Sequence, residues 1–478
     1  MPELAPPPTQ ERLTDSDIAA AVERLYQQKK GVAAALIEVV CREGIVELRG
    51  FTNSLLSRGR AADIAKAVRG VRGVINEISI RTPDVPDAEL QRRAELALLQ
   101  DPAAGGYNIR CCAQHGELSV EGTLQSWAEE QLVLHVLLGV PGARQINNRL
   151  HVRGGGLTNS DEEITTQIRE FLAWDIRVKS ALVNIRTEQG VVHLSGTVGS
   201  AAEHDQVVAT AYMAGATHVE ARDLFVAYWA LDQALRRLKF SPKTDEAIAQ
   251  AIRDALRYDL RVDSYALTVH VREGVVTLLG GMSSLRARLA AEQDAGNVVG
   301  VLAVHNLLQV HVQNPSPDTA IAGQIIAALA DDAYVGSYAF SVTVNAGQVQ
   351  LHGTVDAHFD QERAADVAAG SAGVVALENY VQVCAERFAP HAEAEALGFV
   401  PLPVSNAAAD LHLEQRIRDH YDWSALLHDQ DIAIEVREGR VTLTGYVDTW
   451  RDRKQAAADA YSCGAGDVNN HLHLTVTE

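Results

Sequence analysis

The stretch GVVTLLG at residues 274–280 has the pattern of a β-strand that directly follows a tight turn, because apolar side chains fill its alternate positions. Five similar heptads occur elsewhere: GIVELRG at 44–50, GELSVEG at 116–122, GVVHLSG at 190–196, GQVQLHG at 347–353 and GRVTLTG at 439–445. The first glycine of each heptad ends a short turn such as REG or EQG, where we expect a positive φ. Each heptad is therefore predicted to be the second strand of a β-hairpin.

A second landmark follows the closing glycine of every heptad by 19 or 20 residues. It reads Gly-[Val/Ala]-x-x-[apolar]-x-Asn, with Asn76, Asn148, Asn306, Asn379 and Asn470 in five copies. The third copy has Ala221 at the asparagine position. Two landmarks at a nearly fixed spacing, six times over, indicate internal duplication. We expect the asparagine to be a polar residue of a turn or of the entry to a strand.

The residues around the landmarks predict five elements in every unit. A helical pattern with Asp or Thr near its N-cap, such as DEAIAQAIRDALRY at 245–258, precedes the hairpin. A second helix follows the heptad, and the last strand contains the asparagine. Because a helix joins strands two and three, we expect them to be parallel. The fold class is therefore α+β, a tandem array of six small αββαβ domains, each a three-stranded mixed sheet with two helices on one face.

The spacing of the landmarks also sets the expected domain boundaries. The six units are expected at 15–82, 84–153, 161–226, 244–313, 318–384 and 410–478. A mobile Pro-rich tail is expected at 1–14, and linkers at 228–243 and 386–409. The linkers would group the units as three, two and one.

Composition excludes several classes of protein. The chain of 478 residues has a formal net charge of −20, which argues against a nucleic-acid partner. The number of cysteines is five, an odd number, and their spacing suggests neither a metal site nor a disulfide framework. No apolar run has the length of a transmembrane segment, and no signal peptide is recognisable. We therefore expect a cytoplasmic protein, with export by a dedicated machinery or association with the envelope as the alternatives.

The repeated unit resembles the BON domain, named for bacterial OsmY and nodulation proteins. The residues that carry the resemblance are the acidic-capped first helix, the x-V-x-V-x-x-G-x-V-x-L-x-G hairpin and the closing Gly-Val-x-x-Val-x-Asn-x-Leu. It extends over nearly the whole chain outside the tail and the linkers. The resemblance implies a non-enzymatic binding module, associated in various members with phospholipid or envelope surfaces, osmotic stress or potassium.

No pattern of residues indicates catalysis. The sequence has no GxGxxG turn, Walker A loop, HExxH or GxSxG motif, so we expect no catalytic, cofactor-binding or metal-binding residues. His471 and His473 in the stretch HLHL would lie on one face of a strand, but two ligands alone make a weak metal site. We expect a protein that is not an enzyme.

One position could contact a partner. It lies five residues past each closing glycine, at the start of the second helix, and holds Leu55, Trp127, Ala201, Leu285, His358 and Trp450. The large side chains Leu55, Trp127, Leu285, His358 and Trp450 are candidate partner or lipid contacts, because tryptophan suits buried anchors. The alternative is packing against an adjacent unit.

Charge differs between the two ends of the chain. Unit one has 11 basic and 8 acidic residues, a net charge of +3, whereas unit six has 7 and 13, a net charge of −6. Opposite ends could steer head-to-tail contact between copies, and free sheet edges invite further strands. We expect a multivalent binding or scaffold protein that self-associates as an oligomer or filament. The alternatives are a potassium-binding stress-response protein and a protein that binds phospholipid or envelope surfaces.

Overall fold

The computed structural model describes residues 13–153, 160–178, 182–231, 239, 243–262, 267–312, 316–384 and 406–475. Most of the tail expected at 1–14 and most of both expected linkers lie outside the described residues. Of the expected linkers, residues 228–231 form the short 3-10 helix η3 (Tyr228–Leu231), and 406–409 form the start of α13 (Asn406–Trp423).

The first three domains, numbered in chain order, have the same succession of α-helices and strands, and domain 1 has a short 3-10 helix in addition. Domain 1 comprises α1 (Asp15–Gln28), η1 (Ala34–Leu36), β1 (Ile37–Arg42), β2 (Ile45–Thr52), α2 (Leu55–Lys66) and β3 (Gly73–Ile80). Domain 2 comprises α3 (Asp87–Gln100), β4 (Ile109–Gln114), β5 (Glu117–Leu124), α4 (Trp127–Leu138) and β6 (Gln145–Val152). Domain 3 comprises α5 (Asp161–Trp174), β7 (Val183–Glu188), β8 (Val191–Val198), α6 (Ala201–Met213) and β9 (His218–Val226).

The last three domains repeat this succession. Domain 4 comprises α8 (Asp245–Tyr258), β10 (Leu267–Arg272), β11 (Val275–Met282), α9 (Leu285–Gly296) and β12 (Ala303–Val310). Domain 5 comprises α10 (Asp318–Asp331), β13 (Phe340–Asn345), β14 (Gln348–Val355), α11 (His358–Ala369) and β15 (Ala376–Val383). Domain 6 comprises α13, β16 (Asp431–Arg437), β17 (Arg440–Val447), α14 (Trp450–Ser462) and β18 (Asp467–Leu474). The predicted αββαβ order is thus confirmed in all six domains.

Each domain has its own three-stranded mixed sheet, with the heptad strand in the middle. In domain 4 the heptad strand β11 pairs antiparallel with β10 and parallel with β12, and the other five sheets have the same directions. The parallel pairing follows from the helical crossover, as predicted. Val276 and Leu278 of β11 point into the core of the domain, whereas Leu279 is partly exposed on the opposite face.

The hairpin turn that precedes each heptad has a left-handed backbone at two successive residues. In domain 4 these are Glu273, with a φ of 51°, and Gly274, with a φ of 73°. Two positive φ angles match the twist of a two-residue hairpin, and glycine adopts the second without steric cost. The predicted role of the glycine is confirmed.

The aspartate at the start of the first helix holds this turn in place. Asp245 accepts hydrogen bonds from the backbone N–H groups of Glu273 at 2.8 Å and Gly274 at 3.0 Å. The hydroxyl group of Thr244, one residue earlier, provides the helix cap. The equivalent aspartate accepts a hydrogen bond from the turn in every domain: Asp15, Asp87, Asp161, Asp245, Asp318 and Asp410. The expected cap is thus provided in domain 4 by Thr244, and the aspartate has the additional role of binding the turn.

The asparagine of the second landmark connects the second helix to the last strand. The Asn306 amide donates a hydrogen bond to the carbonyl oxygen of Arg288 in α9 at 2.9 Å, and its oxygen accepts one from the N–H of Leu308 at 3.3 Å. In domain 3 alanine replaces the asparagine at Ala221. There, the pairing of β8 with β9 is irregular between His193 and Ser195. The asparagine thus links the last strand to the second helix in domain 4, whereas β9 of domain 3 is nine residues long and has one more residue than β12.

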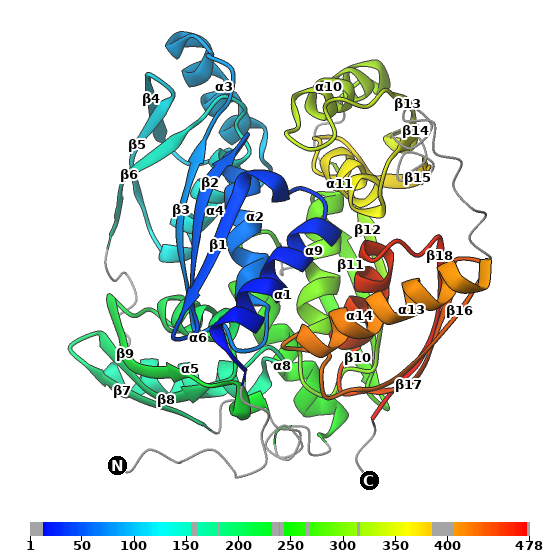
Figure 1. Cartoon of the computed structure of the whole chain (residues 1–478). Helices are drawn as coiled ribbons and strands as arrows, with labels where there is room; N and C mark the ends of the chain where they lie inside the picture. Colours follow the sequence, from blue (N-terminus) through cyan, green and yellow to red (C-terminus); the bar gives the residue numbers. More distant parts are fainter. Residues whose placement is uncertain are drawn as a thin grey trace.

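Every domain has a separate hydrophobic core between its sheet and its two helices. In domain 4 this core includes Ile252 of α8, Leu278 of β11 and Ala291 of α9, all of which are buried. Figure 1 shows α2, α9 and α14 near the middle of the molecule, whereas the sheets β4–β6, β7–β9 and β16–β18 lie at its periphery. The chain therefore folds back so that helices of different domains meet inside.

Candidate interaction surfaces

The residues at the start of the second helix join domains 1, 2 and 3 in a closed cycle. Leu55 of domain 1 is part of the core cluster of domain 2. Trp127 of domain 2 stacks on Tyr212 of domain 3, with 5.3 Å between the ring centroids. Ala201 of domain 3 belongs to the core cluster of domain 1. Each domain thus contacts the next, and the third contacts the first.

Domains 4, 5 and 6 form a second cycle through the equivalent residues. Leu285 of domain 4 is part of the core cluster of domain 5. His358 of domain 5 stacks on Tyr461 of domain 6, with 4.1 Å between the ring centroids. Trp450 of domain 6 lies against Gly296 of domain 4, where a Cβ atom would come within 2.7 Å of the indole ring.

These contacts change the grouping expected from the linkers. The domains form two sets of three, 1–3 and 4–6, rather than three, two and one. All five expected partner residues, Leu55, Trp127, Leu285, His358 and Trp450, contact another domain of the same chain. Leu55 is 2% exposed and Leu285 6% exposed, so these two contribute little to the outer surface.

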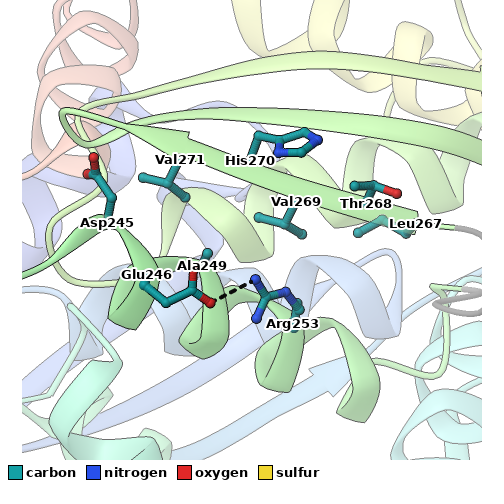
Figure 2. Close-up of a pocket in the computed structure, with 9 residues that line it drawn as sticks. All are labelled: Asp245, Glu246, Ala249, Arg253, Leu267, Thr268, Val269, His270 and Val271. Atoms are coloured by element: carbon teal, nitrogen blue, oxygen red, sulfur yellow. Dashed lines mark hydrogen bonds and ion pairs between the residues drawn. The ribbon is translucent and has the colours of Figure 1, made fainter.

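The edge strand β10 of domain 4 lies along an open groove (Figure 2). The groove has a volume of about 370 Å³ and is lined by Leu267–Val271 of β10 and by the facing side of α8. On the helix, Arg253 forms an ion pair with Glu246 at 3.3 Å. Because β10 pairs only with β11 in its sheet, its outer edge offers backbone hydrogen-bonding groups to an added strand.

A comparable groove follows the edge strand β18 of domain 6. It has a volume of about 450 Å³ and is lined by residues 470–474, with Leu302 and Arg453 beside them. His471 and His473 lie along this edge, where the sequence suggested at most a weak metal site. Among the described residues, no group of three or more His, Cys, Asp or Glu side chains could hold a metal ion. The strand edge itself is the recognisable feature of this groove.

The outer faces of the sheets differ between domains at one cross-strand position. Domain 1 has an ion pair there, between Arg49 and Glu77 at 3.1 Å. Domain 4 has Leu279 opposite Leu307, and Leu307 is 58% exposed. The corresponding pair is Glu121 and Arg149 in domain 2 and His352 and Tyr380 in domain 5, where the two rings stack. This difference between the domains was not predicted, although the sixth residue of each heptad carries the signal.

A larger groove of about 1480 Å³ lies between the helices of domains 2, 3 and 4. Its lining is mixed, with Trp127, Phe171 and Tyr258 among the aromatic side chains. Asp294 also lines it, where burial and the nearby Asp259 carboxylate raise the pKa of Asp294 to about 8. The Asp294 carboxyl group therefore holds a proton at neutral pH and can donate it in a hydrogen bond to Asp259.

A buried Cys, His and Asp lie together where domain 6 meets domain 1. Cys463 Sγ is 3.6 Å from His420 Nδ1, and His420 Nε2 is 3.3 Å from Asp459 Oδ1. Burial and the Asp459 carboxylate raise the pKa of the Cys463 thiol to about 12. A nucleophilic cysteine needs a thiolate and access to solvent, whereas these three residues are at most 4% exposed. The geometry fits a structural contact better than catalysis.

The chain belongs to the BON domain family, whose model matches residues 14–82, 86–154, 160–223, 244–311, 317–385 and 409–476. One relative is osmotically-inducible protein Y of Escherichia coli K12, 33% identical over 125 residues. That match covers 25% of this chain and 62% of the relative, so it spans less than two thirds of the relative's length.

Two solved structures of CdsD, a structural protein of the type III secretion system of Chlamydia trachomatis, are also similar at 15% identity. They cover 45% and 44% of this chain and 100% and 91% of their own, with a TM-score of 0.12 in both cases. Within the described residues, no helix combines the length and the apolar character needed to cross a membrane.

Proposed function

We propose that this BON-family protein is a non-enzymatic, multivalent binding or scaffold protein that associates with further copies of itself. The observation that carries the proposal is the arrangement of six separate sheets, each with two edge strands free of pairing to another described sheet. Several weak sites on one chain gain affinity from their linkage. The open grooves along β10 and β18 support strand addition as the mode of contact.

The family relationship supports a role in the response to osmotic stress. The relative in Escherichia coli is named for its osmotic induction. A protein that works through many similar surfaces needs no catalytic group, and the buried cysteine described above offers none. We place the protein among stress-related binding proteins on this basis.

Mass measurement over a concentration series tests self-association. Light scattering of the native chain should give masses that rise above 51.6 kDa with concentration, and electron microscopy of the same samples should show defined assemblies. A mass that stays at one chain up to the highest attainable concentration would contradict the proposal.

The other two expected functions stay predictions. Potassium binding should raise the melting temperature in potassium over that in sodium at equal ionic strength. Phospholipid binding should carry the protein into the pellet with anionic vesicles at low salt, against the repulsion expected from a net charge of −20. The cytoplasmic location is also a prediction, which cell fractionation would test.

A further inference from the structure

The same backbone contact joins domain 3 to domain 4 and domain 6 to domain 1. In the first, the N–H of Ile176 donates to the carbonyl oxygen of Asn297 at 3.0 Å, and the N–H of Val299 donates to Trp174 at 2.9 Å. In both contacts, the segment after a first helix pairs antiparallel with the segment after a second helix.

The contact between domains 6 and 1 uses equivalent residues. The N–H of Ala425 donates to the carbonyl oxygen of Ala67 at 3.0 Å, and the N–H of Arg69 donates to Trp423 at 2.9 Å. A tryptophan ends the first helix in both cases and packs on the core of the neighbouring domain. Trp174 packs on the core of domain 4, and Trp423 packs on the core of domain 1.

Local features indicate that domains 1–3 and 4–6 are two copies of one three-domain set. The first helices of domains 2 and 5 both have proline at the N-cap, Pro86 and Pro317. Those of domains 3 and 6 both end in tryptophan. In such a tandem, the third domain of one set contacts the first domain of the next set. Domain 3 contacts domain 4 in this way, and domain 6 contacts domain 1, the first domain of the other set.

Charge adds specificity to the contact between domains 6 and 1. Asp459 of domain 6, which is 2% exposed, forms an ion pair with Lys29 of domain 1 at 3.0 Å. His420 lies 3.3 Å from the same carboxylate and 2.9 Å from Gln28 of domain 1. The positive charge of domain 1 thus faces the acidic domain 6. An ion pair this deeply buried discriminates strongly against a partner that lacks the opposite charge.

We propose that domain 6 of one copy docks on domain 1 of a second copy through this contact. The partner is a second copy of this chain, because, among the described residues, the pairing segment 67–69 and Lys29 occur together on the surface of domain 1. Residues 385–405 connect domain 6 to the rest of the chain, and a stretch of 21 residues can reach about 70 Å when extended. The proposal rests on the self-association proposed above and names the surface that produces it.

Concentration decides between closure within one chain and exchange between chains. The linkage gives domain 6 an effective concentration of about millimolar order near its own domain 1. Contact with a second copy uses the same residues. It therefore competes with the contact within one chain only at high protein concentration. A species in which two chains exchange domain 6 is a domain-swapped dimer, and an open series of such contacts is a filament.

A charge exchange tests the proposal. Lys29→Asp and Asp459→Lys each place like charges across the contact within one chain, so each variant alone should break the contact of domain 6 with its own domain 1. When the two variants are mixed, opposite charges meet only between different chains. We expect a two-chain species of about twice 51.6 kDa in the mixture and not in either variant alone. The double variant K29D/D459K is the matched control and should behave as the native chain.

The possible results distinguish failure of the contact between domains 6 and 1 from failure of self-association itself. Folded single variants whose mixture stays at the mass of one chain would overturn the contact. If Asp459→Lys fails to fold, Asp459→Asn takes its place and should weaken native oligomers about tenfold or more. Native oligomers that D459N leaves unchanged would overturn this contact but leave self-association standing. A native chain that stays monomeric at every concentration would overturn both.

Discussion

The carboxylate of Asp245 is worth testing first, because a residue with the same role occurs in every domain. It accepts two hydrogen bonds from the turn between β10 and β11, and hydrogen bonds to charged groups are stronger than neutral ones. Asp245→Ala should destabilise this hairpin by about 1–3 kcal/mol. Hydrogen exchange of the amides in 267–280 should then accelerate about tenfold to a hundredfold.

Glu246→Ala is the matched control for that change. Glu246 follows Asp245 in the same helix turn, and its side chain is 84% exposed and forms an ion pair with Arg253. Surface ion pairs of this kind contribute about 0–1 kcal/mol. Equal exchange rates in both variants would show that the aspartate does not hold the turn.

The protonated Asp294 predicts a dependence of stability on pH. Burial, together with the Asp259 carboxylate, raises the pKa of Asp294 from 3.8 to about 8, whereas Arg261 and Arg177 act in the opposite direction. The folded chain therefore holds a proton that the unfolded chain releases, and its free energy of unfolding falls as the pH rises from about 4 to 8. Asp294→Asn should remove this decrease in the free energy of unfolding and stabilise the protein by at least about 1 kcal/mol above pH 8.

Urea unfolding at pH 4.5 and pH 8.5 measures this difference. The advantage of D294N should be larger at the higher pH, because only there does the native Asp294 carry its unfavourable charge. An advantage that is the same at both pH values would show that Asp294 is already ionised in the folded protein.

Among the elements, the hairpins were predictable from the sequence, but the hydrogen bonds that join their turns to the first helix were not. The alternation in 274–280 and the turn glycine determine the strand, its partner and its buried face without reference to distant residues. The aspartate stands 29 residues before the turn glycine in every unit, as Asp245 stands before Gly274. That constant spacing was a signal in the sequence, but local capping chemistry accounts for an aspartate at a helix start equally well.

Replacement of glycine by alanine should have opposite effects on stability in the hairpin and in the second helix of domain 1. Gly50 has a φ of 125°, and a Cβ atom there would lie 1.9 Å from the carbonyl oxygen of Leu36. Gly59 is exposed within α2, with nothing within 4 Å of an added Cβ atom. Gly50→Ala should destabilise the protein by at least about 2 kcal/mol, whereas Gly59→Ala should stabilise it by about 0.5–1 kcal/mol.

Thermal melting of the two glycine variants gives the comparison directly. Opposite shifts of the midpoint from that of the native chain are expected. A midpoint for G50A at or above the native value would mean that the hairpin can relax around the added methyl group.

At the scale of the whole molecule, the sequence could not determine which domains meet. Six units with the same landmarks offer many equivalent pairings, and the choice depends on side chains far apart in the chain. Trp127 stacks on Tyr212 of domain 3, whereas Trp450 packs against Gly296 of domain 4. A tryptophan at the start of a helix indicates a contact but does not identify its partner. The two sets of three domains therefore become visible only in the structure.

Trp450 closes the cycle of domains 4, 5 and 6, and its removal should loosen the whole set. Its ring lies against Gly296 and has the Lys454 amine 5.0 Å from its centroid. Trp450→Ala leaves a space between domains 6 and 4 and should cost about 2 kcal/mol. We expect the melting temperature to fall by about 4–8 °C, and the transition to broaden as domain 6 separates from the others.

Tyr446→Ala is the control for this change, because Tyr446 is a large aromatic residue of the same domain that is 55% exposed on the outer face. Loss of its ring should alter the free energy of unfolding by no more than about 0.5 kcal/mol. Calorimetry of both variants distinguishes loss of a contact between domains from loss of aromatic surface. If W450A melts like Y446A, the cycle does not depend on this tryptophan, and other contacts, such as those of Leu285 and His358, hold domains 4–6 together.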